Sequence, residues 1–148
     1  MRLFLDTNVT LDVLAKRQPW LHDSATVLSL LESDEFDGIV AAHSITTLYY
    51  LCVKELGRDQ ATAALVALLK LVSVAPLDQD TILKAIALGW RDFEDAIQML
   101  SAADANADYL VTRNASDFKA SPIPVVSPSE LLGILRSQGP RLQKPDHE

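Results

Sequence analysis

Short apolar runs alternate with amphipathic stretches along most of the chain. The short runs have the length and the apolar content of buried strands, whereas the longer stretches carry apolar residues at the three- and four-residue spacing of helices with one buried face. The predicted strands cover residues 2–5, 38–42, 72–75, 109–112 and 125–126. The predicted helices cover residues 9–18, 21–33, 44–56, 59–70, 78–88, 92–105 and 127–136.

This alternation of strands and helices predicts an α/β fold. We expect three layers, α/β/α, around a central and mainly parallel sheet of about five strands. We interpret residues 1–136 as one domain and residues 137–148, which contain Gly139, Pro140 and Pro145, as a disordered tail. In such folds ligands bind beyond the carboxyl ends of the strands, so the residues at those ends are the first candidates for function.

Composition and charge narrow the class of protein. The chain has 148 residues, of which 49% are hydrophobic, and its only cysteine is Cys52. It therefore needs no disulfide to fold, and a reducing cytoplasm fits it. No apolar stretch approaches the length of a membrane span or of a secretory leader, so we expect no membrane contact. The net charge of -7 argues against indiscriminate binding to nucleic acid, but it suits a basic protein partner.

Acidic and amide side chains gather around two of the predicted strands. Asp6 closes the first strand, Asn114 and Asp117 follow the fourth, and Asp95 lies on the helix before the fourth. Each has a purely structural alternative. Asp6 could cap a helix, Asp95 could complete a capping box with Asp92, and Asn114 could form an Asx turn.

Two further expectations concern the helices around these acids. We expect Phe93, Ile97 and Leu100 to form the buried stripe of the helix that carries Asp95. We also expect Ser44 to cap the helix that follows the second strand.

Parallel strands would bring several of the acids to one edge of the sheet. Two carboxylates about 4 Å apart repel each other by about 4 kcal/mol at an effective dielectric constant near 20. A divalent cation removes this conflict, and hard oxygen ligands favour Mg²⁺ or Mn²⁺. The chemistry that follows is attack of a metal-activated water on a phosphodiester.

Four segments, in order over roughly residues 2 to 135, resemble the signature blocks of PIN domains. These are FLDTNVTLDVL, HSITTLYYL, DFEDAIQMLSAADANADYLVTRNASDF and PVVSPSELL, and they are most similar to the bacterial PIN_3-like subgroup. The resemblance implies a metal-dependent ribonuclease acting on RNA. Many bacterial members are VapC-like toxins that a small antitoxin neutralises. Such toxins are often homodimers, for which the predicted helix over residues 59–70 offers a face.

The resemblance also assigns roles to single residues. It implies Asp6, Asp95 and Asp117 as ligands of the metal and as catalytic residues together with Asn114. It implies assisting roles for Glu94, Thr112 and Asn8. Weaker candidates for contacts with RNA phosphates are Arg113, Lys16 and Arg17.

One position departs from the family pattern. The usual second acid of the family would stand at Tyr50, and the nearest acid downstream is Glu55. The departure leaves open a second interpretation, a catalytically weak or inactive PIN-like module that binds RNA or protein. A third, a phosphatase of the haloacid-dehalogenase type, would need a second aspartate where this chain has Asn8.

Overall fold

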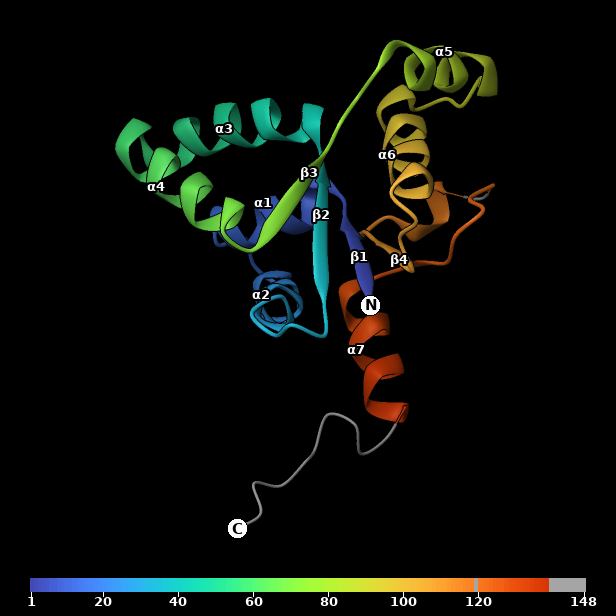
Figure 1. Ribbon diagram of the computed structural model, residues 1–148. Helices are drawn as coiled ribbons and strands as arrows, with labels where there is room; N and C mark the ends of the chain where they lie inside the picture. Colours follow the sequence, from blue (N-terminus) through green and yellow to red (C-terminus); the bar gives the residue numbers. More distant parts are fainter. Residues whose placement is uncertain (119, 139–148) are drawn as a thin grey trace.

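The computed structural model describes residues 1–118 and 120–138 (Figure 1). Most of the predicted tail, residues 139–148, therefore lies outside the described residues, while Ser137 ends the last helix. The strands are β1 (Arg2–Leu5), β2 (Asp37–Ala41), β3 (Val72–Ala75), β4 (Tyr109–Val111) and β5 (Val125–Val126). The helices are α1 (Thr7–Leu14), α2 (Leu21–Leu30), α3 (Ala42–Leu56), α4 (Arg58–Leu69), α5 (Gln79–Leu88), α6 (Phe93–Asp104) and α7 (Pro128–Ser137), with a 3₁₀ turn, η1 (Ala115–Asp117).

The five strands form one parallel sheet in the order β3-β2-β1-β4-β5. Its middle strand is β1, where Phe4 pairs with Ile39 on one side and with Leu110 on the other. All the strands point the same way, so their carboxyl ends share one edge. The prediction of an α/β fold with about five mainly parallel strands is confirmed.

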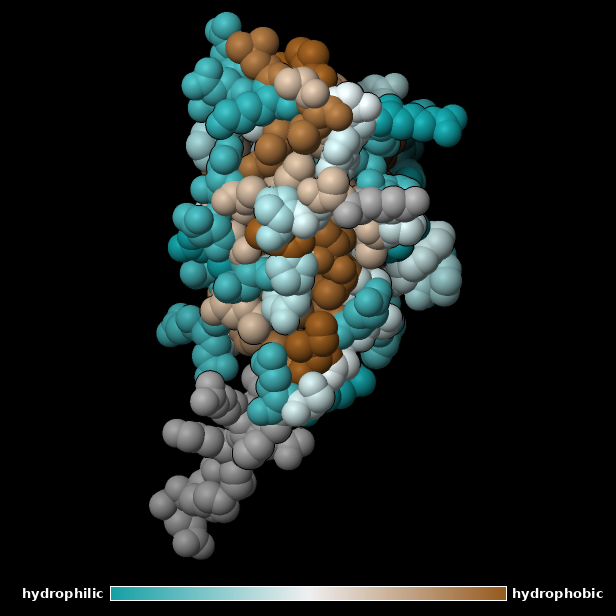
Figure 2. Space-filling model, turned by 90° about the vertical axis from the view of Figure 1, so that its right-hand side faces the viewer, coloured by the Kyte–Doolittle hydropathy of each residue, from teal (hydrophilic) through white to brown (hydrophobic). Residues whose placement is uncertain are grey.

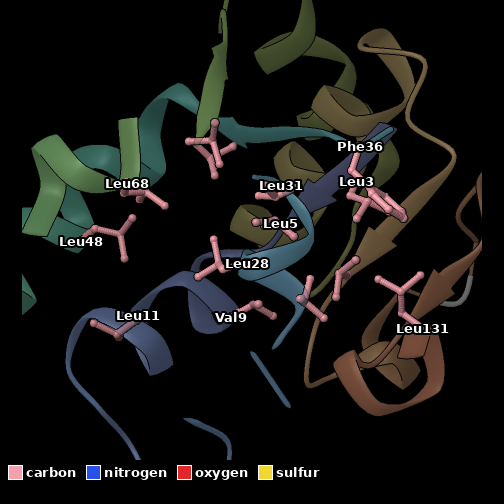
Figure 3. Close-up of a cluster of buried hydrophobic side chains, with 14 of the residues drawn as sticks. Leu3, Leu5, Val9, Leu11, Leu28, Leu31, Phe36, Leu48, Leu68 and Leu131 are labelled. Carbon is pink, nitrogen blue, oxygen red and sulfur yellow. The ribbon is translucent and has the colours of Figure 1, made fainter. Parts of the chain in front are cut away.

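Alternate residues of β1 face two different cores. Leu3 and Leu5 enter a large cluster with residues of α1, α2, α3, α4 and α7, several of which converge in Figure 3. Phe4 enters a second cluster with Met99 and Ala102 of α6. In Figure 1, α1 to α4 lie to the left of the sheet and α5 and α6 to the right. Helices therefore cover both faces, which confirms the three-layer architecture.

Local signals in the sequence account for several of the helix ends. The side chain of Ser127 accepts a hydrogen bond from the backbone N–H of Glu130, and the carboxylate of Glu130 accepts one from the backbone N–H of Ser127, which completes a capping box at the start of α7. Gly57 (φ 81°) ends α3 and Gly89 (φ 64°) ends α5, both with the positive φ that glycine tolerates best.

Two expectations about the helices were wrong. α3 begins at Ala42 without a capping side chain, and Ser44 is instead buried inside the molecule. Phe93, expected in the buried stripe of α6, is 45% exposed. It is the first residue of α6, and continuous burial on this helix begins only at Ala96.

Among the residues described, no helix is both long enough and apolar enough to cross a membrane.

Candidate active site at the carboxyl edge of the sheet

Asp6 lies where the middle strand ends and caps α1. One carboxylate oxygen accepts a hydrogen bond from the backbone of Thr7 (2.7 Å) and the other accepts one from the hydroxyl of Thr112 (2.7 Å). The residue is only 6% exposed. Burial raises the pKa of Asp6, the two hydrogen bonds lower it, and the nearby charges of Glu94 and Asp92 raise it again. Asp6 is thus both a helix cap and a fixed carboxylate at the centre of the edge.

Hydrogen bonds hold the residues after β4 against Asp6 and the start of α1. The fully buried Thr112 accepts hydrogen bonds from the Asn8 amide (3.3 Å) and from the backbone of Asn114 (3.1 Å). Asn8 also accepts a bond from the backbone of Arg113 (3.3 Å). Asn8 and Thr112, both expected to assist, therefore orient Asp6 and the turn that follows β4.

Asp95 is a second acid of this edge whose pKa is raised, as that of Asp6 is. It lies in the first turn of α6, where its backbone N–H donates to the capping carboxylate of Asp92 (3.1 Å). Burial, and after it the charges of Asp92, Asp6, Asp117 and Glu94, together raise the pKa of Asp95 to about 7. The capping role of Asp92 is confirmed, but within the described part of the chain the Asp95 carboxylate accepts no hydrogen bond from the backbone of Asp92 that would complete a capping box.

A cleft of about 920 Å³ opens beside Asp95. It is lined by Trp90, Arg91, Asp92, Phe93, Glu94, Asp95, Ser116, Asp117 and Ala120. Asp117 reaches it from η1, a turn that the sequence did not predict as a helix, whereas Asn114, just before η1, is exposed and does not line it.

Glu94 points toward the start of α3. Its carboxylate lies 3.7 Å from the imidazole of His43. Burial lowers the pKa of His43 and Glu94 counteracts this. Because its charge also raises the pKa of both Asp6 and Asp95, Glu94 belongs electrostatically to the same acidic group.

The atoms at this edge that could bind a metal suit a hard cation. They are carboxylate oxygens, and each oxygen of Asp6 can accept more than the one hydrogen bond it has. Among residues 1–118 and 120–138, no three Asp, Glu, His or Cys side chains are close enough to hold an ion by themselves. Mg²⁺ usually needs only one or two carboxylates, since waters and substrate phosphates complete its shell. The residues present therefore fit Mg²⁺ or Mn²⁺.

A buried hydrogen-bond network, which sequence reasoning missed, lies behind the acids. Gln98, one turn after Asp95, donates from its amide to the hydroxyls of Thr7 (2.9 Å) and Ser44 (3.0 Å). These two hydroxyls are 2.7 Å apart. The network joins α6, α1 and α3, and so fixes the helix of Asp95 relative to Asp6. A glutamine among apolar residues of a helix was the only signal in the sequence.

Two of the three basic residues proposed to contact RNA form ion pairs within the protein. Arg113 forms an ion pair with the fully buried Asp12 (2.6 Å), and its guanidinium lies 3.9 Å from the ring centre of Trp20. Arg17 pairs with Glu55 (2.7 Å), while Lys16 is exposed. Contacts of these three residues with RNA stay a prediction.

Tyr50, at the position expected for a second acid, is 64% exposed on α3. The ammonium group of Lys54 lies 5.8 Å from the centre of its ring. Tyr50 lies two helical turns beyond His43. Neither Tyr50 nor Glu55 lines the cleft.

Comparisons with known proteins agree with this architecture. The chain is 25% identical over 134 residues to Ribonuclease VapC1 of Aquifex aeolicus (strain VF5), covering 87% of this chain and 92% of the relative. The structure resembles that of VapBC-1 from nontypeable Haemophilus influenzae (TM-score 0.67, 19% identity, 87% of this chain and 99% of the other). It also resembles VapBC2 from Rickettsia felis bound to a promoter DNA fragment (TM-score 0.66, 20% identity, 86% and 98%). These two structures share its fold.

A match between the sequence and a family model identifies the family. A family model described as PIN domain, designated PIN_3, matches residues 2–116, which include Asp6 and Asp95 and end one residue before Asp117. With its parallel sheet, with Asp6 directly after the central strand and with Asp95 in the first turn of α6, the chain belongs to the PIN domain family.

Proposed function

We propose that this protein is a divalent-metal-dependent endoribonuclease that hydrolyses RNA phosphodiester bonds with Asp6, Asp95 and Asp117. The observation that carries the proposal is the electrostatic state of Asp95. Its pKa is raised to about 7 by burial and by four neighbouring carboxylates at the edge of an open cleft. Like charges held together in this way are stabilised when a cation binds between them, and functional sites are where such perturbed groups gather.

The relatives support the reaction. The matching relative of Aquifex aeolicus is named a ribonuclease, and the match covers most of both chains. The family assignment also argues against the phosphatase interpretation, which Asn8 already disfavoured.

Each acidic residue has a different role in the proposed reaction. Asp6 is fixed by two hydrogen bonds and can hold a cation in one place. Asp95 can exchange a proton near neutral pH because of its raised pKa. Asp117 lines the cleft from the turn after β4, where its carboxylate would be a further ligand of the cation, and Asn114 is exposed on the same turn. Mg²⁺ or Mn²⁺, when bound, supplies activation of water and neutralisation of charge on the phosphate.

The test is cleavage of a mixed RNA panel with Mn²⁺, with Mg²⁺ and with EDTA. We expect cutting only with metal, and a loss of at least about a hundredfold in Asp6→Asn and in Asp95→Asn, as is common when a charge-stabilising group is removed. Asp59→Asn, an exposed acid on α4, serves as the control and should cut at the parental rate. Cutting by the parent in EDTA would refute the metal dependence.

A second candidate is a PIN-like module that binds RNA or protein without cutting. Tyr50 in place of the second acid, and a site without three preformed ligands among the described residues, favour it. Folded parent protein that binds RNA but cuts none of the panel with either metal would establish this alternative.

We further propose that the protein is the toxin of a toxin–antitoxin pair in the cytoplasm. Several structures with this fold are VapBC complexes, and one is described as a toxin-antitoxin complex. The net charge of -7 suits a partner with a basic segment. Co-expression with the product of the adjacent gene tests this. A stable complex that suppresses cleavage is expected, and independent purification of the two proteins would contradict it.

A further inference from the structure

Phe93 is an exposed aromatic residue in the wall of the acidic cleft. It follows the cap Asp92 directly and is 45% exposed, although its helix buries six of its other residues. A lone exposed apolar side chain is ordinary on a protein surface. This one lines the cleft that Asp95 and Asp117 also line, so it lies where a bound ligand would meet it.

The other lining residues on this side are also of kinds that bind nucleotides. Trp90 is partly buried and held by an edge-to-face contact with Phe118 (6.1 Å between ring centres, 79° between planes). Arg91 is exposed, and within the described ranges it has no ion-pair partner. It is the only basic residue among the described residues that line the cleft. The wall from 90 to 93 thus combines a fixed ring, a free cation and an exposed ring.

Charge alone cannot hold RNA in this cleft. The net charge of the chain is -7, and four of the lining residues are acids, namely Asp92, Glu94, Asp95 and Asp117. Phosphate contacts with basic residues normally dominate affinity for nucleic acid. A substrate that enters here needs an attraction that does not depend on charge, and stacking of bases on aromatic rings supplies one.

We propose that the cleft holds one unpaired RNA nucleotide beside the scissile phosphate, with its base stacked on Phe93 and its own phosphate held by Arg91. The inference rests on the proposed ribonuclease function and names how that site selects its substrate. A base inside a duplex presents its faces to its neighbours, so only an unpaired nucleotide can stack on a side chain in this way. The volume of about 920 Å³ leaves room for a nucleotide and its phosphates.

The test uses binding, so that it does not depend on cleavage. The non-cutting Asp6→Asn protein is titrated with a ten-nucleotide single-stranded RNA that carries 2-aminopurine at one position in turn. We expect quenching of the probe at one position and, in Phe93→Leu, loss of that quenching with roughly 5- to 150-fold weaker binding. Phe93→Trp keeps a ring and should retain both. Ile86→Ala, which removes an apolar side chain 60% exposed on α5 outside the cleft, is the matched control and should bind as before.

Salt dependence separates stacking from charge. The slope of log affinity against log salt concentration should become shallower in Arg91→Gln by roughly 0.7, the contribution of one phosphate contact on a single strand. In Phe93→Leu the slope should stay unchanged. Arg58→Gln, on α4 and outside the cleft, is the control for Arg91. Melting curves of each variant establish that it is folded.

The outcomes distinguish this inference from the proposed function. If the parent cuts RNA but Phe93→Leu binds RNA as tightly as the protein with Phe93, the nucleotide subsite is wrong and the ribonuclease function stands. If the parent does not cut but binding depends on the ring, the subsite stands and hydrolysis fails. If Phe93→Leu changes RNA affinity no more than Ile86→Ala does, the subsite is overturned. It is also overturned if Phe93→Leu changes the oligomeric state of the protein but not its affinity for RNA.

Discussion

At the scale of single residues, the site is defined by the raised pKa of Asp95, which burial causes first and the neighbouring carboxylates second. Its pKa is about 7 in the folded protein, against an ordinary value of 3.8. The folded state therefore binds the proton more tightly than the unfolded chain does. The ionised form carries a cost in stability that is absent below about pH 4, grows as the pH rises toward 7 and is complete above 7.

Asp95→Asn should therefore stabilise the metal-free protein, and only at higher pH. We expect the free energy of unfolding to rise by roughly 1–3 kcal/mol at pH 8 and to change little at pH 4. Urea denaturation in EDTA at the two pH values measures this. Asp59→Asn, on exposed α4, should show no such dependence on pH. A variant less stable than the parent at pH 8 would contradict the account.

Thr112 makes the opposite kind of contribution, since its hydroxyl stabilises the charged form of Asp6. The bond of 2.7 Å lowers the pKa of that carboxyl. Thr112→Val keeps the shape but removes this bond together with the two that the hydroxyl accepts from Asn8 and Asn114. We expect a loss of roughly 1.5–3 kcal/mol of stability at pH 8 from the bond to the charged group, to which the two other bonds add. Thr112→Ser keeps the hydroxyl and should restore most of it. Equal losses in both variants, measured by urea denaturation, would point to packing instead.

At the scale of elements, Gln98 links three helices that carry the site. Its amide bonds to Thr7 and Ser44 are fully inside the protein. Gln98→Met preserves length but leaves the two hydroxyls without that donor, and we expect it to destabilise the protein by roughly 1–3 kcal/mol. Chemical denaturation measures the loss.

Ser24 offers a matched control for that prediction. It is fully buried, and its hydroxyl has no hydrogen-bond partner among the residues described. Ser24→Ala should therefore change stability by less than about 0.5 kcal/mol, because no bond is lost. A loss as large as that of Gln98→Met would show that burial of any hydroxyl, and not the network, accounts for the effect.

The elements themselves were largely predictable from the sequence. Apolar runs marked the strands, and caps such as Ser127 and stops such as Gly89 marked helix ends, because these signals are local. Ser44 was misjudged because its partners come from α1 and α6, which no local pattern reveals. Phe93 was misjudged because helical periodicity does not tell where along a helix contact with the sheet begins.

The site was predictable only in part for the same reason. The rule that strand ends share an edge brought Asp6 and the turn after β4 together, and the resemblance to PIN domains selected Asp95. Neither could show that Arg113 pairs with Asp12, or that Asn8 and Thr112 brace Asp6, since these contacts depend on side chains from distant segments.

At the scale of the whole molecule, the most exposed large apolar side chains lie on α3, α4 and α5. Hydrophobic side chains, flanked by hydrophilic ones, gather at the top of Figure 2, over α5, where Leu83 and Ile86 are more than half exposed. On α4, which the sequence suggested as a dimer face, Val66 and Leu69 are exposed.

If the protein is a homodimer through α4, substitutions on α4 and on α5 should affect the dimer differently. Val66→Lys places a charge on α4 and should convert a dimer into a monomer, whereas Ile86→Lys on α5 should not. Light scattering coupled to gel filtration measures the molar mass. A dimer that survives Val66→Lys but dissociates in Ile86→Lys would place the interface on α5.

The central claim is that Asp6 and Asp95 share a divalent cation that is needed to cut RNA. The most direct measurement determines bound Mn²⁺, by electron paramagnetic resonance, and the RNA cleavage rate on the same samples of parent, Asp6→Asn and Asp95→Asn at pH 6 and pH 8. The account predicts that the parent binds Mn²⁺ more tightly at pH 8, because the proton on Asp95 competes, and that binding and cleavage fall together in both variants. Cleavage that persists in both variants, or without bound metal, would contradict it.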